Sequence, residues 1–148
     1  VGLVRVENNK IVAREHQLIN PLTNFSSFCV NVHGIQPEDV ENAPTFDLVW
    51  NELSPMLKDI DFLAAHNAPF DRSVLKACCK EFEIIESIHP FICSMKASRK
   101  CWDINPTRLN NVCNHLGIEL NHHDALSDAN ACAEIIIKAI KKGYSIKY

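Results

Sequence analysis

Residues 122–129 read HHDALSDA, a polar turn that leads directly into the last strongly apolar segment of the chain. Apolar residues recur at helical spacing after this turn, and Asp124 stands where a side chain can cap the helix that they predict. Asp128 then lies one turn inside the helix, and His123 lies just before it. The stretch therefore predicts an imidazole and a carboxylate together at the start of a helix.

A second polar stretch, residues 66–71, reads HNAPFD and joins an apolar run to another helix pattern. The run, residues 60–65, is typical of a buried strand. Pro69 suits the first turn of the helix, so Asp71 falls in that turn, just beyond the carboxyl end of the strand. The helix dipole alone also favours an acid there, which gives Asp71 a structural as well as a chemical interpretation. The inner face of this helix is expected to carry Phe70, Val74, Leu75, Cys78 and Phe82.

The rest of the chain alternates strand and helix signals. Residues 1–6 and 11–13 predict a hairpin around a turn, and residues 21–31 read as a loop. A further buried strand is expected within 84–93. Helices are expected at 36–40, from Thr45 until Pro55 shortens the pattern, at 94–100 and at 109–116. This order predicts a single α/β domain over residues 1–148, with a mixed β-sheet flanked by helices.

Composition is that of a soluble globular protein, because 47% of the 148 residues are hydrophobic and 22% are charged. No apolar run is long enough to cross a bilayer and no signal-peptide pattern opens the chain, so we expect a cytoplasmic protein with no membrane partner. The net charge of -3 argues against broad electrostatic coating of nucleic acid, but not against a nuclease that holds a short end through metal ions. Seven cysteines without a Cys-x-x-Cys pair indicate reduced, mostly buried thiols.

Positive charge is concentrated in one stretch, with Lys96, Arg99, Lys100 and Arg108. A solvated helix face is the simpler interpretation of such a run, and contact with phosphate groups is the alternative. The sequence alone does not separate the two.

Two aspartates at the starts of separate helices, with a histidine five residues before one of them, suit metal-assisted hydrolysis. Carboxylate oxygens are hard ligands that favour Mg²⁺ or Mn²⁺, and such sites hold two ions about 3.5 to 4 Å apart. A neighbouring imidazole that titrates near neutral pH can take the proton from the attacking water. On residue type alone, His122 and His123 are equal candidates for this base.

These motifs resemble those of the DEDDh 3′–5′ exonucleases, which share the ribonuclease H-like fold and include the epsilon proofreading subunit of DNA polymerase III. Residues 66–71 look like the family's second exonuclease motif. Residues 123–129 look like its third, in which a histidine stands five residues before an aspartate. The supporting stretches 32–35, 43–46 and 109–112 are also similar, so the resemblance covers nearly the whole chain.

The resemblance implies stepwise release of nucleoside monophosphates from single-stranded DNA or RNA 3′ ends, with two Mg²⁺ or Mn²⁺ ions. Asp71 and Asp128 would be metal ligands, and His123 would be the general base. A DNA polymerase is a candidate partner protein. Substrate contact would come from the second motif, through Asn67, His66 and Phe70. For Asn67, capping of the following helix is an equally good alternative to substrate contact.

The family's first motif, an Asp-x-Glu on the strand before the hairpin, has no counterpart in this chain, which opens in the middle of the hairpin. That motif supplies two of the family's four acidic ligands, and its strand is central to the sheet. We therefore expect an N-terminally truncated domain that lacks the first central strand. We also expect an incomplete metal site and little activity from the 148 residues alone.

Two other functions stay open on the sequence. A non-catalytic nucleic-acid-binding or interaction module could keep the exonuclease-like fold without the first motif. An unrelated zinc hydrolase that uses His122, His123 and Asp128 is the weaker alternative, because no third ligand stands at a recognisable spacing.

Overall fold

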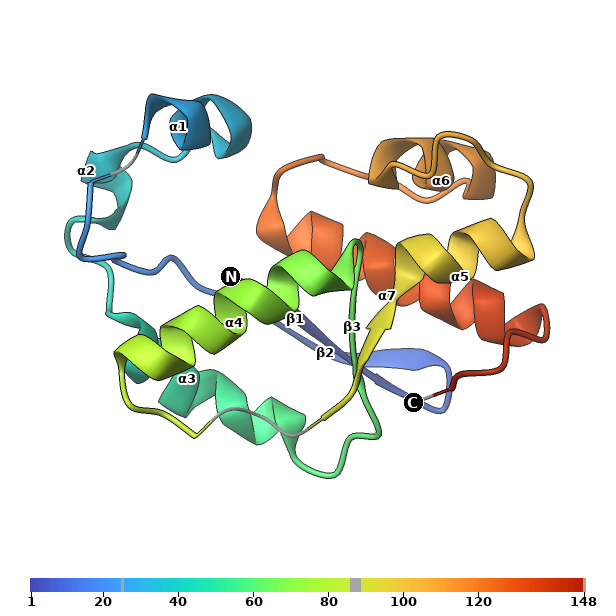
Figure 1. Ribbon diagram of the computed structural model, residues 1–148, viewed down its shortest axis with the longest axis horizontal. Helices are drawn as coiled ribbons and strands as arrows, with labels where there is room; N and C mark the ends of the chain where they lie inside the picture. The colour runs from blue at the N-terminus through green and yellow to red at the C-terminus, as the bar shows by residue number, and fades with distance from the viewer. Residues whose placement is uncertain (25, 86–88, 148) are drawn as a thin grey trace.

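The computed structural model describes residues 1–24, 26–85 and 89–147, which form an α/β domain (Figure 1). In the view of Figure 1, α4 lies to the left of β3 and β4, α5 and α6 lie to the right, and α7 runs across from one side to the other. No helix in the described ranges is long and apolar enough to span a bilayer. The elements in chain order are β1 (Gly2–Glu7), β2 (Lys10–His16), α1 (Ser27–His33), α2 (Pro37–Val40), α3 (Phe46–Leu53), the 3₁₀ helix η1 (Ser54–Leu57), β3 (Leu63–Ala65), α4 (Ala68–Glu81), β4 (Phe91–Cys93), α5 (Ser94–Cys101), α6 (Leu109–Leu116) and α7 (Ala125–Lys141).

β1 and β2 form the hairpin that the sequence predicts. They pair antiparallel over their whole lengths, with one register shift inside β1. The turn residues Asn8 and Asn9 both have positive φ, at 51° and 59°, a conformation that asparagine tolerates and that suits the twist of a hairpin. β2 ends at His16, within the extended stretch that the sequence predicts as far as Ile19.

β3 and β4 form a separate parallel pair, with Leu63 opposite Phe91. β4 is buried as predicted, through Ile92 and Cys93. The prediction placed this strand within 84–93, but the observed strand begins at Phe91. Residues 84 and 85 are irregular, and residues 86–88 lie outside the described part of the chain. The strand directions are mixed, as expected, but across the described residues they form two separate pairs instead of one continuous sheet.

The hydrophobic core is built around α7. One cluster joins α7 to α6 through Ile135 and Val112, both fully buried. A second cluster joins α7 to β4 and α5 through Ile136, Ile92 and Ala97. This packing places the start of α7, and the polar turn before it, on a rigid support.

A cavity of about 590 Å³ separates the β1–β2 hairpin from the β3–β4 pair. β1 lines one wall, residues 59–64 line another, and α7 contributes Cys132, Ile136 and Ile140. Because of this cavity, β3 is not the buried strand that its apolar sequence predicts, and Ala64 is exposed. β1 also has no fully buried residue. In the described structure, β1 and β3 each have one strand partner, and both face the cavity.

α1 was not predicted, because residues 21–31 read as a loop. Ser26 caps this helix by accepting a hydrogen bond from the Cys29 main-chain NH at 3.2 Å, and Gly34 ends it at a φ of 73°. None of the α1 residues is buried, and Phe28 and Val32, which stand one helical turn apart, are both exposed, so α1 takes no part in the core. The other helices follow the prediction: Pro55 shortens α3 to a 3₁₀ turn, and Gly117 ends α6 at a φ of 64°.

α4 begins as predicted, but its expected inner face is wrong in part. Ala68 and Cys79 are its buried residues. Phe70 and Val74 are instead 65% and 46% exposed. α4 packs against β3 and β4, and the side that carries Phe70 and Val74 meets solvent. Phe70 therefore lies at the surface, next to Asp71 in the first turn of α4.

Candidate active site

The turn before α7 is held by hydrogen bonds at both ends. The Asp124 carboxylate accepts from the Ser127 main-chain NH at 2.7 Å, which confirms the predicted cap. The Ser127 hydroxyl accepts from the Asn121 main-chain NH at 2.8 Å. His123 lies between these anchors with a φ of 73°, a left-handed conformation that histidine adopts more readily than most residues. The two histidines of the turn are therefore fixed above the N-terminus of α7.

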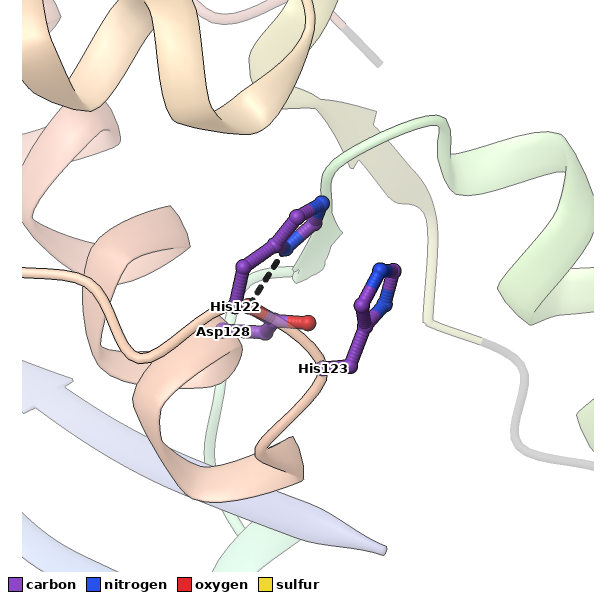
Figure 2. A group of neighbouring side chains, drawn as sticks. All are labelled: His122, His123 and Asp128. Atoms are coloured by element: carbon purple, nitrogen blue, oxygen red, sulfur yellow. Dashed lines mark hydrogen bonds and ion pairs between the residues drawn. The ribbon is translucent and has the colours of Figure 1, made fainter. Parts of the chain in front are cut away.

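His122, His123 and Asp128 form one cluster (Figure 2). Nδ1 of His122 lies 3.3 Å from Oδ1 of Asp128. The two imidazole rings stack with centroids 3.9 Å apart and 21° between their planes. One ligand atom from each residue lies within 4.8 Å of the others. Figure 2 shows both rings and the carboxylate on the same side of the turn, so all three face one space.

The second motif lies at the junction of β3 and α4. Asn67 precedes α4 with a φ of 73° and makes no side-chain capping hydrogen bond, so the capping alternative is not seen. Asp71 lies in the first turn of α4, as predicted. Desolvation by burial raises the pKa of Asp71, only partly offset by a backbone hydrogen bond. Among the described residues, no cationic side chain forms an ion pair with it.

His66 differs from the other site residues because both of its ring nitrogens are engaged. Nε2 lies 3.0 Å from the Thr107 carbonyl oxygen, and Nδ1 lies 2.9 Å from the Ser94 hydroxyl. A carbonyl oxygen only accepts, so Nε2 carries the proton and Nδ1 accepts from Ser94. Desolvation by burial lowers the pKa of His66, which keeps the ring neutral. His66 thereby joins the end of β3 to α5 and to the segment before α6.

The donor groups of the site fit a divalent cation. Asp71 is a partly desolvated carboxylate that lacks a cationic partner in the described structure, the state that a metal ion relieves. Asp128 and His123 supply a second carboxylate and a neighbouring imidazole. Cysteine ligands are not indicated, because burial raises the pKa of Cys113 to about 11 and of Cys132 to about 12. Among the described residues, Asp71 lies outside the cluster of His122, His123 and Asp128. Asp71 and Asp128 are therefore two candidate ligands that the cluster does not join.

Comparison with known proteins gives the family. The family model described as Exonuclease (RNase T) matches residues 1–136. The chain belongs to this exonuclease family. The PolC-type DNA polymerase III of Caldanaerobacter subterraneus subsp. tengcongensis is 31% identical over 144 residues, which cover 96% of this chain and 10% of that protein. The PolC-type DNA polymerase III of Bacillus subtilis (strain 168) is 29% identical over 144 residues, or 95% of this chain and 10% of that protein. The chain thus spans about a tenth of the length of these relatives.

Solved exonuclease structures share the fold. Exonuclease X, in complex with 5′ overhanging duplex DNA, superposes with a TM-score of 0.77 at 25% identity, covering 96% of this chain and 82% of that one. The nuclease domain of 3′hExo, described as a DEDDh family member bound to rAMP, gives a TM-score of 0.76 at 21% identity, covering 90% and 74%. The resemblance to DEDDh exonucleases and the ribonuclease H-like fold are therefore confirmed.

The basic stretch of this exonuclease domain is partly used within the protein. Nε of Arg99 donates to the Thr107 hydroxyl at 2.8 Å. Nζ of Lys100 lies 5.7 Å from the centroid of the Tyr144 ring, a cation–π contact. All four basic residues are exposed. This fits the simpler interpretation of a solvated face, and contact with phosphate groups stays a prediction.

Sequence reasoning did not find the two partners of His66. Ser94 is fully buried, and Thr107 is 5% exposed. They stand 28 and 41 residues from His66 in the chain, so no local pattern connects them. A buried hydroxyl needs a partner. Ser94 stands in an apolar segment of the sequence, so a hydrogen-bond partner for its hydroxyl could be expected. The sequence does not show that this partner is His66.

Proposed function

We propose that this exonuclease domain is a metal-dependent 3′–5′ exonuclease that releases nucleoside monophosphates from single-stranded 3′ ends of DNA or RNA. The observation that carries the proposal is the capped turn before α7, which holds His123 and Asp128 together in a chain of the exonuclease family. An imidazole beside a metal-binding carboxylate is the combination that water activation at phosphorus requires.

Asp71 and Asp128 would hold the metal ions, and their carboxylate oxygens favour Mg²⁺ or Mn²⁺. Two such ions stabilise the attacking and leaving oxygens of the displacement. His123 would accept the proton of the attacking water through a ring nitrogen, and its exposed position allows water to reach it. His122 contacts Asp128 more directly, but His123 has the family spacing of five residues before the aspartate.

The residues of the second motif would contact the substrate in different ways. Phe70 is 65% exposed beside Asp71, so its ring can stack on a terminal base. Asn67 would offer its side-chain amide from the same junction. His66 would act indirectly, by holding β3, α5 and the Thr107 segment in place, because both ring nitrogens already have partners. The relatives with DNA and with rAMP support both nucleic acids as substrate classes.

Two of the four acidic ligands implied by the family resemblance would come from a strand that fills the cavity beside β1. Gly2, at one end of β1, approaches Ala125 so closely that an added Cβ would clash with the Ala125 carbonyl oxygen. Arg5, farther along, donates to the main-chain oxygens of Met56 and Lys58, just ahead of β3. β1 therefore runs from the start of α7 toward the segment that leads into β3. A strand in the cavity that runs antiparallel to β1 would end beside Gly2 and the start of α7, and hence beside Asp128.

A DNA polymerase is the proposed partner protein. The PolC-type relatives are DNA polymerase III proteins, and the segment that matches this chain is about a tenth of each. An exonuclease unit that works on the 3′ end of a growing strand is consistent with that context.

The proposal is tested by a degradation assay on this domain, extended upstream by a strand that carries Asp-x-Glu. We expect mononucleotide release that depends on Mg²⁺ or Mn²⁺ and that Asp128→Asn strongly reduces. Asp103→Asn, at an exposed position after α5, is the matched control and should leave the rate unchanged. A correctly folded, extended protein that binds single strands without cutting them would instead favour a non-catalytic binding module.

A further inference from the structure

His122 has no assigned role in the proposed hydrolysis, yet its ring contacts the Asp128 carboxylate. Its Nδ1 lies 3.3 Å from Oδ1 of Asp128, and its ring stacks on His123. The cluster thus offers two imidazole nitrogens and one carboxylate oxygen within 4.8 Å. Figure 2 shows that all three side chains project into the same space.

The chemistry of these donors differs from that of an all-carboxylate site. Mg²⁺ prefers oxygen ligands and keeps several waters, so two imidazoles add little to its binding. Imidazole nitrogen suits zinc and the neighbouring transition metals, and two imidazoles with one carboxylate are a known zinc-binding set. The cluster therefore favours a transition-metal ion over Mg²⁺.

The spacing of the donors also fits a small tetrahedral ion. Bonds of about 2.0 to 2.1 Å in tetrahedral geometry place neighbouring ligand atoms about 3.4 Å apart. The 3.3 Å between His122 and Asp128 already matches this distance. Both histidines are exposed, so small rotations of their rings toward the ion meet no buried neighbour, while the Asp124 cap holds the turn in place.

We propose that His122, His123 and Asp128 together bind one divalent transition-metal ion of the zinc type, and that this ion inhibits the exonuclease. The binding of the ion is argued from the donor geometry and does not depend on the proposed function. Inhibition rests on the proposed function, because the ion would occupy the nitrogen lone pair of His123 and an oxygen of Asp128. Both groups would then be withdrawn from water activation and from Mg²⁺ or Mn²⁺ binding.

Binding is tested on the 148-residue chain by calorimetric titration with Zn²⁺, in the absence of nucleic acid. Cys29→Ser serves as the common background, because Cys29 is an exposed thiol that could bind zinc independently. We expect His122→Asn to weaken the cluster's affinity for Zn²⁺ by at least about tenfold, since loss even of an outer partner of a metal ligand costs about 10- to 100-fold. His115→Asn, an exposed position on α6, is the matched control and should retain the affinity.

A second readout uses Co²⁺ in place of Zn²⁺. Bound Co²⁺ should give visible absorption bands in the background protein that are absent in His122→Asn. Equal Zn²⁺ affinity in the two proteins, or Co²⁺ bands that survive the substitution, would overturn the proposed site.

Inhibition is tested separately in the extended, active domain with Mg²⁺ present. Added Zn²⁺ should lower the rate of the parent protein, and His122→Asn should need at least about tenfold more Zn²⁺ for the same fractional loss. Equal sensitivity in both would overturn inhibition through this cluster, while the binding result would stand. Absence of any exonuclease activity would contradict the proposed function and, with it, the inhibitory role.

Discussion

Nε2 of His66 lies 3.0 Å from the main-chain oxygen of Thr107, so a neutral imidazole connects two segments that are 41 residues apart. The Ser94 hydroxyl completes the contact at Nδ1. Both partners are buried. The geometry makes His66 a structural link beneath the site, which leads to two predictions.

Replacing His66 with alanine should lower stability. The buried Ser94 hydroxyl and Thr107 carbonyl would each lose a partner, and an unsatisfied buried polar group costs about 1 to 3 kcal/mol. Thermal unfolding should show a clearly lower melting temperature for His66→Ala. The exposed His115→Ala on α6 should stay within about 0.5 kcal/mol of the parent. An unchanged His66→Ala protein would contradict the link.

The same contact predicts a loss of stability on acidification. Burial lowers the pKa of His66 below its ordinary value of 6.5. As pH falls below about 6.5, the unfolded chain therefore takes up a proton that the folded chain does not, and stability falls until the pH reaches the folded-state pKa. Above pH 6.5 the full stability is present. Between pH 7.5 and 5.5, the melting temperature should drop more in the parent than in His66→Gln, and an equal drop would contradict this origin.

Asp71→Asn should stabilise the metal-free domain slightly. The pKa of Asp71 is raised by burial, so the folded state holds its proton more tightly and stability falls as pH rises from about 3.8 through the folded-state pKa. At pH 7 the variant should melt up to about 2 °C higher. The difference should vanish below pH 3.8. If instead Asp71→Asn melts lower at pH 7, the helix-dipole role dominates. Exposed Asp103→Asn is the control.

The features that the sequence predicted well are local ones. The Asp124 cap and the Gly117 helix end depend on neighbours a few residues away, so their residue types reveal them. The motif spacing likewise placed His123 and Asp128 together. The errors concern tertiary packing. Phe70 and Val74 were assigned to a buried face, because periodicity cannot show which side of a helix has something to pack against.

Two further misses have the same physical origin. β3 has an apolar sequence but adjoins a cavity, so its burial depends on what fills the neighbouring position. α1 buries no residue, so core packing does not decide whether residues 27–33 form a helix or a loop. His66 was predicted to face substrate, and its partners Ser94 and Thr107 could be recognised only once the chain was folded.

Thiol reactivity should follow burial. Cys29 is exposed, whereas Cys113 and Cys132 have pKa values raised to about 11 and 12. Because the thiolate is the reactive form, a disulfide reagent at pH 7.5 should modify Cys29 first and leave Cys113 and Cys132 until the protein unfolds. Cys29→Ser should remove the fast phase. Rapid modification of Cys132 in the folded protein would contradict the packing around α7.

His123→Ala should lower turnover of the extended domain by about 10²- to 10⁴-fold, the usual contribution of a general base. Folding should be nearly unaffected, because the residue lies in an exposed turn. Rates measured at saturating single strand and Mg²⁺ would separate this effect from weaker binding. A variant that retains full turnover would remove His123 from the mechanism and direct attention to His122.

Degradation of a single strand labelled at either end tests directly whether this site hydrolyses nucleic acid in the 3′–5′ direction. The 148-residue chain and a version extended by an Asp-x-Glu strand would be compared with Mg²⁺ or Mn²⁺. We expect that only the extended domain releases a 3′ label at once as mononucleotide and shortens a 5′-labelled strand stepwise. Immediate release of the 5′ label, or equal activity in the unextended chain, would contradict this expectation.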